Sequence, residues 1–327
     1  MIEPMAVSVP PQEQALEQYR KELTGYCYRM LGSSFEAEDA VQETMLRAWR
    51  ALDRFEGRSQ LRSWVYSIAT NVCLDMLNGK ERRARPMDFG EAGVPVIESL
   101  GEPLAEATWI LPMPDARVVS DSADPAELAA SKETLKLAFV AALQHLPPKQ
   151  RAVLILREVL RWKAEEVAEL LETSVASVNS ALQRARATMG DMEIQPEQVA
   201  DPSDPEHADL LKRYMDAFER YDMDALTELL HEDATLSMPP YSLWLTGPEN
   251  MVTWMLGPGA ACRGSKLVPV MANGSIAFGQ YRASGPDGEH EPWALIVLET
   301  RDGKIIGQNS FLDTASLFPM FGLPAAV

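Results

Sequence analysis

Apolar residues recur at helical spacing through the first quarter of the chain, where they form two stripes. The first has steps of three and four residues, the spacing of one face of an α-helix, and consists of Val41, Met45, Ala48, Leu52 and Phe55. The second has similar steps and consists of Leu61, Val65, Ile68, Val72 and Met76. Ser33 or Ser34 stands where the first helix needs an N-cap. The pattern predicts an all-helical bundle over residues 12–85.

Helical spacing returns over residues 131–192, which divide into helices at 132–145, 149–160, 164–171 and 174–189. The last helix has an apolar face formed by Val175, Val178, Leu182, Ala185 and Met189. Its other face is polar and carries Ser177, Asn179, Ser180, Gln183 and Arg184. A short turn ending at Ser174, a suitable N-cap, precedes it.

This arrangement is typical of a helix-turn-helix, in which Asn and Gln pair with adenine and Arg pairs with guanine in the DNA major groove. The same polar face also suits the solvated side of an ordinary three-helix bundle.

The C-terminal third, residues 205–327, changes from a helical to a strand pattern. Two amphipathic helices are predicted, at 207–222 and 223–234. Runs of β-type residues follow at 235–240, 266–272, 275–283, 292–300 and 304–313. Asn273-Gly274 and Asp302-Gly303 are turn signals between them. Helices followed by a curved antiparallel sheet predict a separate α+β domain.

Residues 86–130 combine six prolines with one basic and nine acidic residues, a composition that predicts an extended linker. Its apolar stretch "TWILPMPD" is expected to dock elsewhere on the chain, because neighbouring Trp, Ile and Leu side chains mark a contact site. The whole chain has a net charge of −18, most of which lies in this linker and in residues 196–327. The helix-turn-helix segment is close to neutral.

The chain has 327 residues, 46% of them hydrophobic and 24% charged, which is typical of folded domains. No apolar run approaches the roughly 20 residues that span a bilayer, and the N-terminus lacks the pattern of a signal peptide. Cys27, Cys73 and Cys262 are too scattered to suggest a metal site. We therefore expect a cytoplasmic protein with no metal and no cofactor.

Two stretches resemble a known family. "EAEDAVQETMLRAWRALDRFEGRSQLRSWVYSIATNVCLDML" resembles region two of the sigma-70 factors, and "LQHLPPKQRAVLILREVLRWKAEEVAELLETSVASVNSALQRARATM" resembles region four. Together they are most similar to the extracytoplasmic function (ECF) group, which has only these two regions. The resemblance implies two all-α sigma domains, at 12–85 and 131–192, joined by the linker 86–130.

The sequence departs from the family pattern around the helix-turn-helix. Members often have Gly-Trp-Ser where this chain has Arg161, Trp162 and Lys163, and Gly is common where it has Glu172. Lys is a poor N-cap, so the helix after Lys163 is expected to start less firmly than usual. Neither departure touches the polar face.

The resemblance implies contacts with core RNA polymerase and with promoter DNA. In the family, region two docks on the β′ clamp helix and region four meets the β flap; the matching region-two positions are Asp39, Gln42, Glu43 and Arg47. A flipped base of the minus-ten element is expected near Phe55, Arg58 and Asn71, while Trp64 is expected in the core. The minus-thirty-five element would be read by Ser177, Asn179, Ser180, Gln183 and Arg184, with Arg186 on a phosphate. The acidic linker would follow the RNA exit path.

Residues 205–327 resemble the SnoaL-like group of polyketide cyclases, a cone-shaped α+β fold with a pocket inside a curved sheet. Candidates for the pocket lining, or for plain core, are Met238, Trp244, Trp254, Met255, Trp293 and Phe311. Enzymes of this group use Asp and His as acid and base. His231 and Asp233 lie at the end of a predicted helix, where His is more often a dipole partner. We therefore expect regulation rather than catalysis.

Two functions remain open. The first is a sigma factor that directs promoter-specific transcription initiation and carries its C-terminal domain as an intramolecular regulator, in place of a separate anti-sigma factor and without a membrane partner. The second is a helix-turn-helix regulator with a ligand-sensing or cyclase-like enzymatic domain. A repressor has no need of a polymerase-docking helix, so the region-two motif favours the sigma factor.

Overall fold

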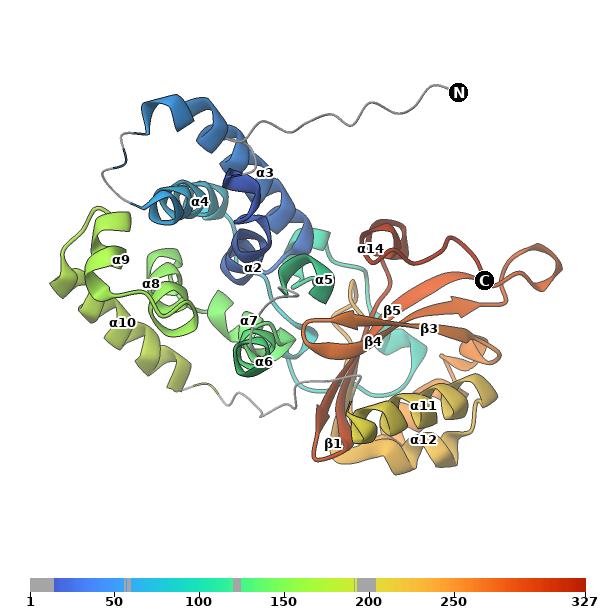
Figure 1. Cartoon of the computed structure of the whole chain (residues 1–327). Helices are drawn as coiled ribbons and strands as arrows, with labels where there is room; N and C mark the ends of the chain where they lie inside the picture. Colours follow the sequence, from blue (N-terminus) through green and yellow to red (C-terminus); the bar gives the residue numbers. More distant parts are fainter. Residues whose placement is uncertain (1–14, 56, 58–59, 120–124, 191, 193–203) are drawn as a thin grey trace, which may run out of the picture. The chain divides into compact units, whose positions relative to one another are not determined.

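The computed structural model forms two compact units, each built from segments that are distant in the sequence (Figure 1). The first unit consists of Met1–Glu81, Arg117–Ser122 and Ala142–Met192. The second consists of Arg82–Ala116, Ala123–Ala141 and Glu193–Val327. The structure describes residues 15–55, 57, 60–119, 125–190, 192 and 204–327.

The N-terminal part of the first unit contains α2 (Arg20–Leu31), α3 (Ser34–Ala51) and α4 (Leu61–Leu77). Helix α2 ends at Gly32, whose φ of 70° is the left-handed conformation that a helix C-terminus favours. The next residue, Ser33, accepts a hydrogen bond from the Glu36 amide and caps α3. The helices meet around Tyr26 and Tyr66, whose ring centroids are 5.2 Å apart. The predicted helical bundle is therefore present.

The helix-turn-helix lies in the C-terminal part of the first unit. Helix α8 (Pro148–Leu154) continues into a π-helical turn (Ile155–Val159), followed by α9 (Ala164–Leu170) and α10 (Val175–Gly190). Helix α10 packs on α8 and α9, and its residues Val178, Leu182 and Ala185 are buried. These are the central positions of the predicted apolar stripe, and its two ends are half-buried.

Within the first unit, α4 packs against α8 and α9, so the two helical regions form one body. The ring of Trp162 lies 5.0 Å from that of Tyr66, and the Arg62 guanidinium lies over both rings. Buried Arg151 donates hydrogen bonds to the Met30 carbonyl and to the Gln144 side chain. Because a buried guanidinium is costly unless its donors find acceptors, these bonds fix the contact between the regions.

A six-stranded curved sheet forms the centre of the second unit, in the order β2-β1-β6-β5-β4-β3. The strands are β1 (Leu230–Ser237), β2 (Trp244–Thr246), β3 (Lys266–Ala272), β4 (Ser275–Arg282), β5 (Glu291–Arg301) and β6 (Lys304–Phe311). Neighbours are antiparallel except β1 and β6, which are parallel. Register shifts in three of the pairs bend the strands.

Helices complete the α+β architecture of this unit. Helices α11 (Pro205–Arg220) and α12 (Met223–Leu229) lie against the sheet (Figure 1), while α13 (Pro248–Leu256) follows β2 and α14 (Thr314–Met320) follows β6. Tyr214 of α11 stacks on Phe278 of β4 with ring centroids 5.2 Å apart. This contact lies in the main core of the unit, which matches the predicted fold class.

Residues 82–116, the linker segment, are part of the second unit instead of a free spacer. The segment contains short helical turns at Pro86–Asp88, Ile97–Leu100 and Glu106–Thr108, and α5 (Asp115–Val118) begins at its end. In its "TWILPMPD" stretch the apolar residues are at most 5% exposed, namely Trp109, Ile110, Leu111 and Met113. The prediction that this stretch docks is confirmed. Composition favoured a spacer because it averages over the segment and hides four consecutive or nearly consecutive buried positions.

Some helices differ from the sequence prediction. The helix expected at 132–145 is divided into α6 (Pro125–Glu133) and α7 (Leu137–Gln144). The helix expected at 223–234 ends at Leu229, because pairing with β6 converts the following residues into β1. Helices α13 and α14 have no counterpart in the prediction. The two compact units also do not follow the predicted domain boundaries at 86–130 and 131–192. Those boundaries describe segments of the sequence and stay predictions.

Within the part of the chain that the structure describes, every helix is too short or too polar to span a lipid bilayer. Cys27, Cys73 and Cys262 are free thiols, and the first two are buried.

Candidate nucleic-acid interface and C-terminal cavity

The polar face of α10 is open to solvent. Its predicted contact residues are all exposed, namely Ser177, Asn179, Ser180, Gln183, Arg184 and Arg186. Asn179 and Gln183 are one helical turn apart, so their amides neighbour each other. The Arg184 guanidinium donates a hydrogen bond of 2.6 Å to the Ser180 hydroxyl, also one turn away. Amide and guanidinium groups side by side on an exposed helix have the donors and acceptors that base edges require.

Side chains fix the start of each helix in the motif. The Ser174 hydroxyl accepts a hydrogen bond of 3.1 Å from the Ser177 amide, so Ser174 is the N-cap of α10 that the sequence predicts. Lys163 provides no side-chain cap for α9, but the Glu166 carboxylate accepts a hydrogen bond of 2.7 Å from the Lys163 amide. This reciprocal bond is half of a capping box and compensates in part for the poor cap.

Both departures from the family pattern lie at unusual backbone angles. Arg161 has a φ of 59° and Glu172 a φ of 50°. These values belong to the left-handed region, which costs a residue with a Cβ about 1–2 kcal/mol. The angles give a physical reason for glycine at these two positions in the family. Here, two larger residues accept the strain.

Arg186 is ion-paired. Its guanidinium lies 2.6 Å from the Glu158 carboxylate, and both side chains are exposed. An exposed pair of this kind contributes about 0–1 kcal/mol, so a DNA phosphate can replace the carboxylate at little cost.

The predicted polymerase contacts lie along one side of α3. Asp39, Gln42 and Arg47 are exposed, and Glu43 is half-buried. Arg47 bonds to Glu43 at 2.6 Å and lies 3.7 Å from Asp75 of α4. These residues form a polar strip that carries acidic and basic side chains, and the ion pairs of Arg47 fix their positions.

A groove lies beside this strip, and it was not predicted from the sequence, because the main apolar stripe of α3 marks only the buried face of the helix. The groove is lined by Leu16, Glu17, Arg20, Gln42, Met45, Leu46 and Trp49. Leu46 is 48% exposed and Trp49 is 56% exposed. Large apolar side chains in water next to polar residues mark a protein-contact surface. The sequence signal is the spacing of Leu46 and Trp49, which forms a second apolar line beside the buried one.

The residues predicted near the minus-ten pocket are only partly brought together. The Phe55 ring lies 5.0 Å from the Trp64 ring. Trp64 is half-buried, so its assignment to the core holds only in part. Asn71 is exposed two turns further along α4. Arg58 lies outside the described residues.

The turn between β3 and β4 grips the linker segment. Asn273 and Gly274 have φ values of 56° and 65°, as an Asn-Gly hairpin turn requires. The Asn273 side chain accepts a hydrogen bond of 2.9 Å from the Met113 amide and donates one of 2.6 Å to the Leu135 carbonyl. The Gly274 amide donates to the Asp115 carboxylate at 2.8 Å. One turn therefore binds two separate stretches of the chain that precede the helix-turn-helix.

Charged groups are buried beside this turn. Lys136 is 3% exposed and donates a hydrogen bond of 3.0 Å to the Ser275 hydroxyl. Burial raises the pKa of Asp115, while the Gly274 amide and the charges of Lys132 and Lys136 act in the opposite direction. Such groups make the contact specific, because a displaced partner leaves them buried and unsatisfied.

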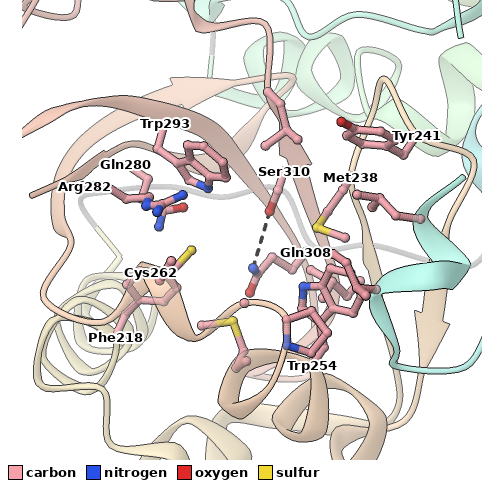
Figure 2. A pocket seen from close by; sticks show the side chains of 18 residues that line it. Phe218, Met238, Tyr241, Trp254, Cys262, Gln280, Arg282, Trp293, Gln308 and Ser310 are labelled. Carbon is pink, nitrogen blue, oxygen red and sulfur yellow. Dashed lines mark hydrogen bonds between the residues drawn. The ribbon is translucent and has the colours of Figure 1, made fainter. Parts of the chain in front are cut away.

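A cavity of about 220 Å³ lies in the second unit, bounded by the sheet and α13 (Figure 2). Of the predicted lining residues, it contains Met238, Trp254, Met255 and Trp293. Trp244 lies outside it and donates its indole N–H to the Gly90 carbonyl at 3.0 Å. Phe311 also lies outside it, beside Pro239 and Leu137.

The polar lining of the cavity was not predicted. It includes Cys262, Gln280, Arg282, Gln308 and Ser310. Gln280 and Arg282 alternate along β4, and Gln308 and Ser310 alternate along β6, which places each pair on one face of the sheet. In β4, where Tyr281 separates the two polar residues, this period of two is the sequence signal. In β6 the signal is hidden, because the intervening residue, Asn309, is also polar.

His231 and Asp233 lie in β1, not at a helix end, and neither belongs to the cavity lining. The His231 Nδ1 is 3.8 Å from an Asp233 carboxylate oxygen. With Glu232 they bring three ligand-type atoms within 4.8 Å of one another, but the carboxylates are exposed, where such groups are common without a metal.

Three protein families match successive parts of the chain: Sigma-70 region 2 at residues 15–83, Sigma-70, region 4 at 136–189, and the SnoaL-like domain at 211–308. The ECF RNA polymerase sigma factor SigG of Mycobacterium tuberculosis is 45% identical over 315 residues, which cover 94% of this chain and 82% of SigG. SigJ of the same organism is 28% identical over 302 residues and 88% of each chain.

A solved structure has a similar fold over nearly the whole chain. The crystal structure of Mycobacterium tuberculosis SigJ matches with a TM-score of 0.61 and 23% identity, covering 95% of this chain and 99% of SigJ. The identity to SigG over most of both chains, together with the two sigma-70 regions, shows the family. The chain belongs to the ECF sigma factors of RNA polymerase and carries a SnoaL-like domain after its sigma regions.

Proposed function

We propose that this sigma factor reads the minus-thirty-five element with α10 in the major groove. Asn179, Gln183 and Arg184 make the base contacts, Ser177 and Ser180 lie beside them, and Arg186 binds a phosphate. The proposal is supported by the exposure of the whole polar face and by the firm cap at Ser174. In region two, Phe55, Arg58 and Asn71 bind the minus-ten element as a flipped base.

Core RNA polymerase binds the polar strip of α3, formed by Asp39, Gln42, Glu43 and Arg47. The adjacent groove adds Leu46 and Trp49, whose exposed apolar area is suited to burial by a partner. By the family resemblance, this partner is the β′ clamp helix, and region four meets the β flap.

The C-terminal domain regulates the two sigma regions through the linker segment. The observation that carries this proposal is that residues 82–116, which connect the regions, fold into the same unit as the C-terminal domain. The Asn273 turn and the bridge between Pro114 and Ala272 of β3 hold the segment there. Because the regulator is fused, its effective concentration is in the millimolar range, so it takes the place of a separate anti-sigma factor.

The size of the first unit supports a closed and an open state. A unit of this length has a radius of gyration of about 14 Å and is about 37 Å across. The two promoter elements are about 25 base pairs apart, or about 85 Å along the DNA. Both reading surfaces cannot reach their elements while α4 packs on α8 and α9, so the regions must separate on the polymerase.

The domain acts by binding and not by catalysis, in the cytoplasm where the polymerase works. The support for binding is that the His231–Asp233 pair lies away from the cavity, so it is not placed to act as acid and base on a molecule held there.

Run-off transcription with purified core polymerase on genomic promoter fragments tests the initiation function. We expect discrete start sites that depend on this chain. Asp39→Arg and Arg47→Glu should weaken core binding in a pull-down several-fold, because both residues lie on the exposed strip, while circular dichroism stays unchanged. Arg213→Glu, at an exposed side chain of α11, is the matched charge reversal and should bind normally. Random initiation, or normal binding by both strip variants, would contradict the assignment.

A further inference from the structure

Among the described residues that line the cavity, Arg282 is the one with a charged side chain. Its guanidinium lies 3.9 Å from the centroid of the Trp293 ring, which holds it in place by a cation–π contact. Among the described residues its side chain makes no hydrogen bond or ion pair, and its Nε is buried without a partner. Its orientation is fixed, its N–H donors are free to bind a ligand, and no carboxylate is found among the described residues that line the cavity. Arg282 is therefore suited to bind an anion.

Most of the other residues that line the cavity are apolar or aromatic. Figure 2 shows Arg282, Gln280 and Trp293 grouped at one end, with Met238, Tyr241 and Trp254 at the other. An apolar cavity of about 150 Å³ is enough to hold benzene. The 220 Å³ here therefore accommodates one aromatic ring and a small polar substituent.

Gln280 supplies an oriented amide beside Arg282. It is 3% exposed and lies two positions before Arg282 on β4, so both side chains face the cavity. Its Nε2 donates a hydrogen bond of 3.0 Å to the Ser265 hydroxyl, which fixes the amide plane.

We propose that this cavity binds a small aromatic carboxylic acid, with the carboxylate on Arg282 beside Gln280 and the ring among Phe218, Met238 and Trp254. The single positive charge at one end favours the acid over its neutral amide. The apolar end favours a planar ring over a compact inorganic anion.

The linker segment also lines this cavity. Ile97 and Leu100, from its middle helical turn, line the cavity. The segment is held on either side by hydrogen bonds of 2.8 Å, from the Gly93 amide to the Trp244 carbonyl and from the Leu104 amide to the Pro240 carbonyl. A bound ring contacts the segment only while it is docked, so binding stabilises docking and docking raises affinity. The consequence for transcription rests on the proposed regulatory function.

Calorimetric titration of the full chain with benzoate and 1-naphthoate tests the site, each against its neutral amide, benzamide or 1-naphthamide. We expect each acid that binds to do so at least tenfold more tightly than its amide. Arg282→Met should abolish that preference, and Arg282→Lys should retain part of it. Arg263→Met is the matched control, because Arg263 also stacks on an aromatic ring, Tyr221, but does not line the cavity. No binding at millimolar acid, or an acid preference that survives Arg282→Met, overturns the proposal.

Hydrogen exchange measured by mass spectrometry tests the coupling. With benzoate or 1-naphthoate bound, amides of residues 93–104 should exchange several-fold more slowly in the wild type and at the unliganded rate in Arg282→Met. Binding without slower exchange at 93–104 overturns the coupling. Failure of the regulatory function is separate: removal of residues 200–327 would then leave transcription unchanged even though the acid binds and protects the linker segment.

Discussion

Asn179 and Arg184 are the residues of α10 whose substitution should weaken promoter binding most directly. Both are exposed, and each has the donor and acceptor geometry for a base edge. We expect Asn179→Ala and Arg184→Ala each to weaken holoenzyme binding to a promoter fragment by about 1–3 kcal/mol. Core binding should not change. Arg213→Ala removes an exposed arginine outside the sigma regions and should bind like wild type. Equal promoter affinity for all of these proteins would contradict the assigned reading face.

Glu172 is the residue whose replacement should stabilise the motif. Its φ of 50° destabilises the folded state by about 1–2 kcal/mol. Glycine would remove this strain, but it would also increase the conformational entropy of the unfolded chain, so only part of the energy is recovered. We expect Glu172→Gly to raise the opening free energy of α9 and α10 by about 0.5–1 kcal/mol in native-state hydrogen exchange. Glu169→Gly, at an exposed position inside α9, should lower it by about 1 kcal/mol. A loss of stability in both variants would show that strain is not released at Glu172.

At the scale of single residues, the sequence was most informative where one face of a helix is plainly apolar. Val178, Leu182 and Ala185 could be assigned to the core from spacing alone. The opposite, polar face of α10 could then be assigned to solvent or to a binding partner. For Arg282 the only such signal is its spacing of two from Gln280 in β4, and this signal is weak because a charged residue in a strand normally faces water. Its place in a cavity depends on the curvature of the sheet and on Trp293 of the neighbouring strand.

The linker segment is the element whose position matters most. Asn273→Gly removes only the side chain that grips it, because glycine adopts a φ of 56° without strain. The Met113 amide and the Leu135 carbonyl then lose their partner, at a cost of about 1–3 kcal/mol for each buried group. We expect amides of residues 108–113 to exchange at least tenfold faster.

The control for this prediction is Asp302→Gly, which changes a residue of similar φ in the turn between β5 and β6. Exchange at residues 108–113 should then stay at the wild-type rate. Unchanged exchange in Asn273→Gly would mean that the turn does not hold the segment.

Elements were predictable as far as local pattern decides them. The helices of the sigma regions and the main strands carry clear periods of 3.6 and 2, and they are present. Residues 230–234 kept a helical pattern but became strand, since pairing of β1 with β6 outweighs a weak local preference. The docking of the linker segment was visible only as the unexplained apolarity of "TWILPMPD"; its partner, the Asn273 turn, lies 160 residues away.

For the whole molecule, the net charge of −18 fits a factor that should not bind DNA indiscriminately. Non-specific binding arises from neutralising phosphates, and an acidic chain suppresses it until the polymerase supplies basic surface. In the proposed mechanism, the two sigma regions determine which promoter is read, and the segment held by the C-terminal domain determines how readily these regions separate.

The most direct test of this account is run-off transcription from one responsive promoter, over a range of sigma factor concentrations. The full chain, Asn273→Gly and a chain lacking residues 200–327 are compared with equal core polymerase. We expect the truncated chain to differ from the full chain several-fold at every subsaturating concentration. Asn273→Gly should change transcription in the same direction, because it releases the same segment. Identical transcription by all three proteins would contradict control through the linker segment.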